Sequence, residues 1–161
     1  MARASQDAML RRHLVELLEG GGAHLGFEEA IADLPADRRG RRPEGQSHTP
    51  WRLLEHMRLS QRDILDFSRD PAYEEQDWPD DYWPQGDAPP DEQSWERAVT
   101  AFRHDLAAMI ALVKAPKTEL LEPIPWGNGQ TVAREAMLLA DHNAYHLGQL
   151  VTVRKLLGAW A

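Results

Sequence analysis

Four stretches of the chain carry apolar side chains at three- and four-residue intervals, and no stretch shows the strict alternation of a half-buried strand. The clearest stripe runs from Trp95 to Val113. An apolar stripe on a helix must be buried against another element, and four such helices can cover one another in a single bundle. We therefore predict an all-α fold: an antiparallel four-helix bundle with long connecting loops.

Local signals place the ends of these helices. Thr49 followed by Pro50 is a strong start signal, because the threonine can cap the helix and proline suits its first turn. The second helix is therefore expected from about Pro50 to Ser68. The other three are expected over residues 5–19, 91–113 or 94–113, and 131–158. In the first, Ser5 is the expected cap, three glycines at 20–22 end the helix, and the expected buried face contains Leu10, Leu14, Leu17 and Leu18.

Two connections are longer than a minimal bundle needs. Residues 69–93 contain five prolines and four aromatic residues, Tyr73, Trp78, Tyr82 and Trp83. A loop of that length is uncommon in a compact domain and is often functional. Residues 123–131 contain Asn128-Gly129, a strong hairpin signal, so a small two-stranded excursion is expected there. Both loops are expected to lie over one end of the bundle as a lid or a pocket wall.

Composition excludes several classes of function. The 161 residues predict one domain over 1–161. There is no cysteine, which excludes disulfides, thiolate metal sites and a cysteine nucleophile. The net charge of −8 argues against nucleic-acid binding, which depends on neutralising phosphates. No apolar run is long enough to span a membrane, and the charged N-terminal segment is no signal peptide, so a cytoplasmic location is expected.

Three histidines are predicted to face the same core. His142 and His146 are four residues apart in the last helix, on the face that carries Leu139 and Leu150. His56 lies three residues after Leu53 in the second helix, again on the apolar face. Buried neutral imidazoles need partners for both nitrogens, and a divalent metal would take one nitrogen from each ring. The alternative is three core histidines with hydrogen bonds of their own.

Two further residues are candidates for catalysis. Asp63 lies one heptad after His56 and could act as a ligand, a base or a salt-bridge partner. Gln149 lies one heptad after His142 and could contact a bound water or substrate, or be a polar residue at the bundle rim. Zinc proteases with an H-E-x-x-H motif need glutamate directly after the first histidine, where this chain has Asn143, so that class is excluded.

The order of WRLLEHMRLSQRDILDF, WPDDYWP and PWGNGQTVAREAMLLADHNAYHLGQLVTVRKLLGAW resembles the DinB-like superfamily from the second predicted helix to the C-terminus. The resemblance implies a four-helix bundle with a three-histidine site for nickel or zinc, and a homodimer. The histidine that this family has in its second helix falls on His56, and its H-x-x-x-H pair falls on His142 and His146. Related bundles include transferases that add low-molecular-weight thiols to electrophiles.

Two hypotheses about function follow. In the first, the chain is a metal-dependent enzyme acting on a small molecule, as a thiol S-transferase or a hydrolase with a metal-bound thiol or water as nucleophile. The thiol would come from a cosubstrate, because the chain has no cysteine. In the second, the protein is a non-catalytic dimeric bundle whose metal is structural or absent. An exchangeable ligand on the metal would distinguish the two.

Overall fold

The computed structural model describes residues 2–160, with side chains from residue 6 onward, and this part of the chain is helical without a β-strand. Four long helices are present: α1 (Ala2–Glu19), α3 (Pro50–Arg69), α4 (Ser94–Lys114) and α5 (Val132–Leu156). A short helix, α2 (Phe27–Ile31), and two 3-10 turns, Ala36–Arg38 and Asp80–Tyr82, lie in the connections. None of the helices within residues 2–160 is long and apolar enough to cross a membrane.

The predicted helix starts are confirmed for α3 and α5. Thr49 Oγ1 accepts a hydrogen bond from the backbone N–H of Arg52 at 3.1 Å, and Thr131 Oγ1 accepts one from that of Arg134 at 3.2 Å. Each hydroxyl satisfies a donor that the first turn of a helix leaves without a partner. α1 starts at Ala2, so Ser5 lies inside the helix and the prediction that it caps the helix is wrong.

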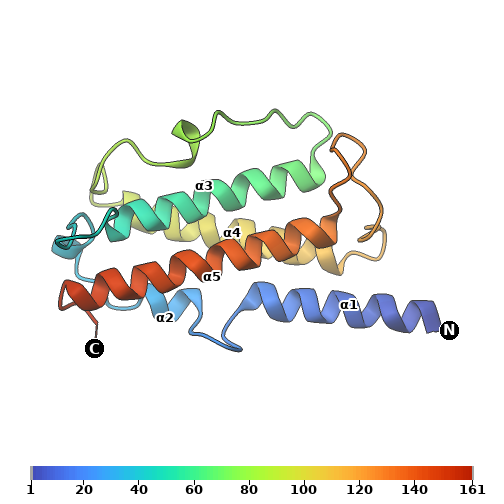
Figure 1. The fold of residues 1–161 in the computed structure, drawn as a ribbon, viewed down its shortest axis with the longest axis horizontal. Helices are drawn as coiled ribbons and strands as arrows, with labels where there is room; N and C mark the ends of the chain where they lie inside the picture. The colour runs from blue at the N-terminus through green and yellow to red at the C-terminus, as the bar shows by residue number, and fades with distance from the viewer. Residues whose placement is uncertain (1, 161) are drawn as a thin grey trace.

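The long helices do not form a simple antiparallel bundle. α3 packs against α4 and α5, and α1 packs against the same two helices. Figure 1 shows that α1 and α5 run in one direction and that α3 and α4 run in the other. α3 therefore has one parallel neighbour, α4, and one antiparallel neighbour, α5, while α1 has α5 as its parallel and α4 as its antiparallel neighbour. The reason is residues 70–93, here called the crossing loop, which return along the whole length of α3 before α4 begins (Figure 1).

Two other expectations are corrected. Leu17 was expected on the buried face of the first helix but is 53% exposed, because Val15 takes its place beside Leu14 and Leu18. Residues 123–131 form no two-stranded hairpin: the only pairing in this segment is an isolated antiparallel bridge between Pro123 and Thr131, supported by a hydrogen bond from Ile124 N–H to the Gln130 carbonyl. With one bridge, the segment turns the chain without adding a sheet.

The apolar core has two parts with buried polar side chains between them. One part joins α2 to the first halves of α3 and α4, and the other joins α1 to their second halves. On α3, Met57 belongs to the first part and Ile64 to the second. The residues between these parts include His56, Ser60, Gln61, Asn143 and His146, all buried. A polar layer therefore crosses the middle of the core, where α3 packs against α5.

Candidate metal centre

The three histidines predicted from the sequence lie together in this layer. His56 comes from α3, while His142 and His146 lie one turn apart on α5. Their potential ligand nitrogens, one from each ring, all lie within 4.8 Å of one another. We call these residues the histidine group. The helical spacing of the pair on α5 and the packing of α3 against α5 are sufficient to bring the rings together.

Two of the rings have a fixed tautomer. His56 Nδ1 lies 2.7 Å from the backbone carbonyl oxygen of Tyr82, and His146 Nδ1 lies 2.7 Å from Oε1 of Gln149. The Tyr82 carbonyl can only accept, so Nδ1 of His56 carries the proton and donates it, and Gln149 in its assigned amide orientation accepts from Nδ1 of His146 in the same way. The Nε2 atoms of His56 and His146 therefore keep their lone pairs. An outer acceptor of this kind is also what orients histidines that bind metals.

His142 has no such partner. Its Nε2 lies 3.1 Å from Nε2 of His56, and its buried Nδ1 has no hydrogen-bond partner. With the proton on Nε2, His142 donates to His56 but leaves Nδ1 unpaired. With the proton on Nδ1, two lone pairs face each other at 3.1 Å. A divalent ion between the rings would take both lone pairs, so the donor set of neutral imidazoles fits a transition metal.

Burial keeps these imidazoles neutral. Desolvation lowers the pKa of His56 to about 4, with a smaller contribution from His146, although the hydrogen bond to Tyr82 opposes the shift. Desolvation also lowers the pKa of His142 to about 4, helped by His146 and His56, while the neighbouring Asn143 side chain acts in the opposite direction. The pKa of His146 is lowered by desolvation as well, while Gln149 acts in the opposite direction. Neutral imidazole is the form that binds a metal, so the group is ready for an ion at neutral pH.

The crossing loop covers one side of the group. The indole of Trp83 stacks on His56 with 3.8 Å between ring centroids and an interplanar angle of 1°. On its other face Trp83 stacks on His48 at 4.3 Å, and the guanidinium of Arg52 lies 5.4 Å from its centroid. The sequence suggested that loop aromatics shape a pocket wall. It could not show that Trp83, Tyr82 and His48 contact the site, because all three lie outside the long helices, where helical spacing predicts nothing.

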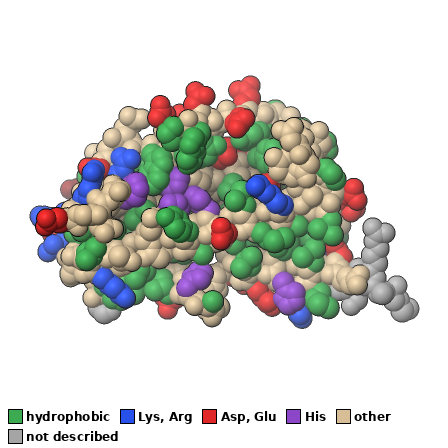
Figure 2. All heavy atoms as spheres, viewed as in Figure 1, with side chains coloured by type: hydrophobic (Ala, Val, Ile, Leu, Met, Phe, Trp, Pro, Cys, Tyr) green, Lys and Arg blue, Asp and Glu red, His purple; other side chains and the backbone are tan. Residues whose placement is uncertain are grey.

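The other side of the group is reachable from solvent. His56 and His146 are 3% and 7% exposed, whereas His142 is only partly buried. Figure 2 shows histidine side chains gathered at the surface beside hydrophobic ones on this face of the molecule. Tyr145, next to the group on α5, is exposed and lies edge-on to His146. Solvent therefore reaches the histidine group at His142, its most exposed member.

The two further candidates occupy different places. Gln149 contacts the group through His146, and its side-chain nitrogen lies 3.3 Å from the Tyr145 hydroxyl. Asp63 does not join the potential ligands: its two carboxylate oxygens accept hydrogen bonds from the hydroxyls of Tyr73 and Tyr82, each at 2.8 Å. Within residues 2–160, the group that could hold a metal here thus comprises three histidines and no carboxylate.

Comparison with known proteins finds one family. The model of the DinB superfamily matches residues 26–150, which include the whole histidine group. No curated protein and no solved structure matches the chain significantly. The match covers more than half of the chain and spans α2 to most of α5.

Proposed function

The chain belongs to the DinB superfamily, and on this premise we propose that it is a metal-dependent enzyme that acts on a small molecule at the histidine group. His56, His142 and His146 would hold the ion. One observation carries the proposal: the group offers three potential ligands, and one of them, His142, is partly exposed to solvent. Structural zinc sites use four protein ligands, whereas catalytic sites use three and keep a position for a small molecule.

Zinc or nickel is the proposed ion, because three imidazoles suit both. When bound, such an ion supplies Lewis acidity, which lowers the pKa of water or a thiol enough to make a nucleophile at neutral pH. The chain's own residues orient the ligands. Tyr82 and Gln149 hold the Nδ1 protons of His56 and His146, and Trp83 keeps water from one face of His56.

The reaction class that we propose is transfer of a low-molecular-weight thiol to an electrophile, or hydrolysis. Both need the same three ligands and an open approach from solvent. The sulfur of a transferase reaction must come from a cosubstrate, since the chain contains no cysteine. Tyr145 is placed to contact a substrate, because it is exposed beside His146 and its hydroxyl lies near Gln149.

The alternative is a non-catalytic bundle in which the ion ties two helices together. One observation favours it: His56 lies on α3 and the other two histidines lie on α5, so an ion would join the helices across the core. In that case removing the metal would lower stability and no turnover would be lost.

Activity measurements separate these hypotheses. The zinc- and nickel-loaded proteins are incubated with small thiols plus an electrophilic aryl halide, and separately with activated esters. Turnover in one panel that disappears in the His142→Ala variant supports the enzyme and identifies its class. Turnover that survives in this variant would place the activity elsewhere. A loaded protein that turns over neither panel, and is stabilised by its metal, supports the structural alternative.

We also propose a homodimer in the cytoplasm. Apolar side chains are exposed on two helices that pack against each other, Met9 and Leu17 on α1 and Met137 on α5. Exposed apolar surface of this kind is common at protein interfaces. Light scattering during size-exclusion chromatography tests the proposal: twice the chain mass of 18.3 kDa is expected, and the single mass would contradict it.

A further inference from the structure

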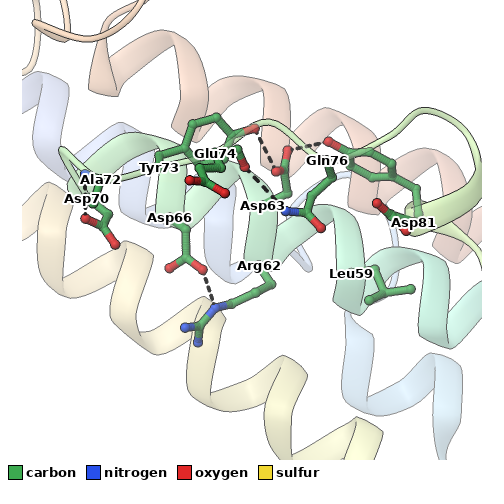
Figure 3. Close-up of a pocket in the computed structure, with 11 residues that line it drawn as sticks. Leu59, Arg62, Asp63, Asp66, Asp70, Ala72, Tyr73, Glu74, Gln76 and Asp81 are labelled. Atoms are coloured by element: carbon green, nitrogen blue, oxygen red, sulfur yellow. Dashed lines mark hydrogen bonds and ion pairs between the residues drawn. The ribbon is translucent and has the colours of Figure 1, made fainter.

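Asp63 ties the crossing loop to α3 beside the histidine group. Its Oδ1 accepts a hydrogen bond from the Tyr73 hydroxyl and its Oδ2 accepts one from the Tyr82 hydroxyl, each at 2.8 Å. Figure 3 shows Asp63 on α3 directed toward the loop, with Tyr73 directed back toward it. Hydrogen bonds to an ionised carboxylate are stronger than those between neutral groups. Burial and the Asp63 charge also hold the pKa of both hydroxyls above the ordinary value, so both stay donors.

Arg52, His56 and Asp63 share one face of α3, because they are separated by four and then seven residues. Each contacts the crossing loop: Arg52 donates to the carbonyl of Pro84 at 3.1 Å, and His56 donates to that of Tyr82 at 2.7 Å. Asp63 holds the loop on the far side of His56 from Arg52. Residues 82–84, which supply the partner of His56, are therefore held by Asp63 at Tyr82 and by Arg52 at Pro84.

Tyr82 links Asp63 to His56, because its hydroxyl and its backbone carbonyl each make one of the hydrogen bonds. Its hydroxyl donates to Asp63 and its backbone carbonyl accepts from Nδ1 of His56. The next residue, Trp83, stacks on the same imidazole. Tyr73 differs in one respect: its hydroxyl also binds Asp63, but its ring packs edge-on to Phe67, away from the histidine group.

We propose that Asp63 is a positioning residue of the metal centre: by holding the Tyr82 phenol, it fixes the carbonyl that accepts the His56 proton, and so directs Nε2 of His56 toward His142 and His146. This inference rests on the proposed metal-dependent function. It gives Asp63 a role other than ligand or base. The crossing loop thereby becomes part of the site, although none of its residues is a ligand.

The test uses two variants that each remove one hydroxyl from the same carboxylate, Tyr82→Phe and its matched control Tyr73→Phe. Nitrogen-15 NMR of the metal-free protein at pH 8 reports which nitrogen of His56 carries the proton. A competing chromophoric chelator reports the affinity for zinc. In the wild type and in Tyr73→Phe we expect the proton on Nδ1 and zinc affinities within about twofold of each other. In Tyr82→Phe we expect a mixture of tautomers and a loss of about tenfold in zinc affinity, as for other outer partners of metal ligands.

Asp63→Ala and Asp63→Asn complete the test. Asp63→Ala should behave like Tyr82→Phe, whereas Asp63→Asn, whose amide can still bind both hydroxyls, should retain the wild-type tautomer. Circular dichroism confirms that each variant is folded. An unchanged His56 tautomer in both Tyr82→Phe and Asp63→Ala, or an equal change in Tyr73→Phe, would overturn the proposal. If instead the wild type binds no zinc while the tautomer still follows Tyr82, the metal-dependent function fails and the role of Asp63 in orienting His56 stands.

Discussion

The contact between α3 and α5 contains two neighbouring sets of polar side chains, and they satisfy their hydrogen bonds to different degrees. In the first set, Gln61 donates to the backbone carbonyl of Phe102 at 2.7 Å and accepts from Nδ2 of Asn143 at 3.0 Å. We call Gln61 and Asn143 the amide pair. The second set is the histidine group, in which Nε2 of His56 and Nε2 of His142 approach to 3.1 Å and Nδ1 of His142 has no partner.

Both sets lie at the same level of the core, so burial alone does not explain the difference. An amide has a donor and an acceptor on one planar group, which lets Gln61 bridge α4 and α5 with neutral partners. Three neutral imidazoles, each with a potential ligand nitrogen within 4.8 Å of the others, offer lone pairs to a single ion. Gln61 therefore has partners for both its groups without a ligand, and only Oδ1 of Asn143 stays unpaired in the amide pair, whereas the histidine group is suited to a cation.

The largest expected difference is the effect of acid on stability, which should come from the histidine group and not from the amide pair. The pKa of His56 and that of His142 are lowered to about 4 by desolvation, against about 6.5 in an unfolded chain. Between pH 4 and pH 6.5 the unfolded state therefore binds more protons than the folded state. The unfolding free energy is highest above pH 6.5 and decreases as the pH falls toward 4. One pKa unit corresponds to about 1.4 kcal/mol, so the loss is on the order of several kcal/mol.

Urea unfolding of the metal-free protein at pH 7 and pH 5 measures this effect. The decrease in unfolding free energy should be smaller in the His56→Gln variant, which lacks one titrating group. It should be unchanged in Gln61→Leu, which alters only the amide pair. Equal pH dependence in the wild type and His56→Gln would show that the buried histidines do not cause it.

Metal should stabilise the fold through the histidine group. At a free zinc concentration 100 times the dissociation constant, binding to the folded state adds about 2.7 kcal/mol to the unfolding free energy. Thermal unfolding with zinc and then with excess chelator measures the gain, which should be present in Gln61→Leu and absent in His142→Ala. A zinc-dependent gain that persists in His142→Ala would assign the ion to another site.

Removing the amide pair should cost stability and leave the metal site intact. Gln61→Leu leaves Nδ2 of Asn143 without its partner in the core and removes the side-chain donor of the Phe102 carbonyl, at a cost of about 1–3 kcal/mol. Urea unfolding should show this loss equally with and without zinc. A zinc affinity that also falls more than about twofold would mean that the amide pair and the histidine group act as one unit.

The smallest effect is expected at Gln149. Gln149→Ala removes the acceptor of the His146 proton, and loss of such a partner weakens metal binding by about tenfold. Gln149→Glu keeps an acceptor and adds negative charge, so it should bind zinc at least as tightly as the wild type. Chelator competition measures both affinities. Equal affinities in the wild type and Gln149→Ala would show that the contact with His146 does not matter for the ion.

The start of α3 and the meeting of the three histidines could be predicted from the sequence. Thr49-Pro50 gave the start of α3, and helical spacing placed His56, His142 and His146 on facing surfaces, because both signals are local. The partner of His146 was also within reach, since Gln149 lies three residues further on the same helix. Its role as a hydrogen-bond acceptor was not predicted, because the choice between substrate, water and histidine depends on side-chain rotamers.

The other contacts of the site depend on the path of the crossing loop. The crossing loop has no periodic pattern, so the contacts of Tyr82 and Trp83 with His56, 26 residues away in the first case, could not be predicted. The same loop makes α3 and α4 parallel, which an expectation of antiparallel neighbours missed. Asp63 was correctly placed on the face of His56, but its partners come from that loop too.

Elemental analysis of protein purified without a histidine tag shows whether the histidine group holds an ion. The wild type, His56→Ala, His142→Ala and Gln61→Leu are each reconstituted with zinc or nickel and freed of unbound ion. We predict about one equivalent of metal in the wild type and in Gln61→Leu, and almost none in either histidine variant, because each removes one of three ligands. Absence of metal from the reconstituted wild type, or an equal content in all four proteins, would contradict the assignment of the histidine group as a metal centre.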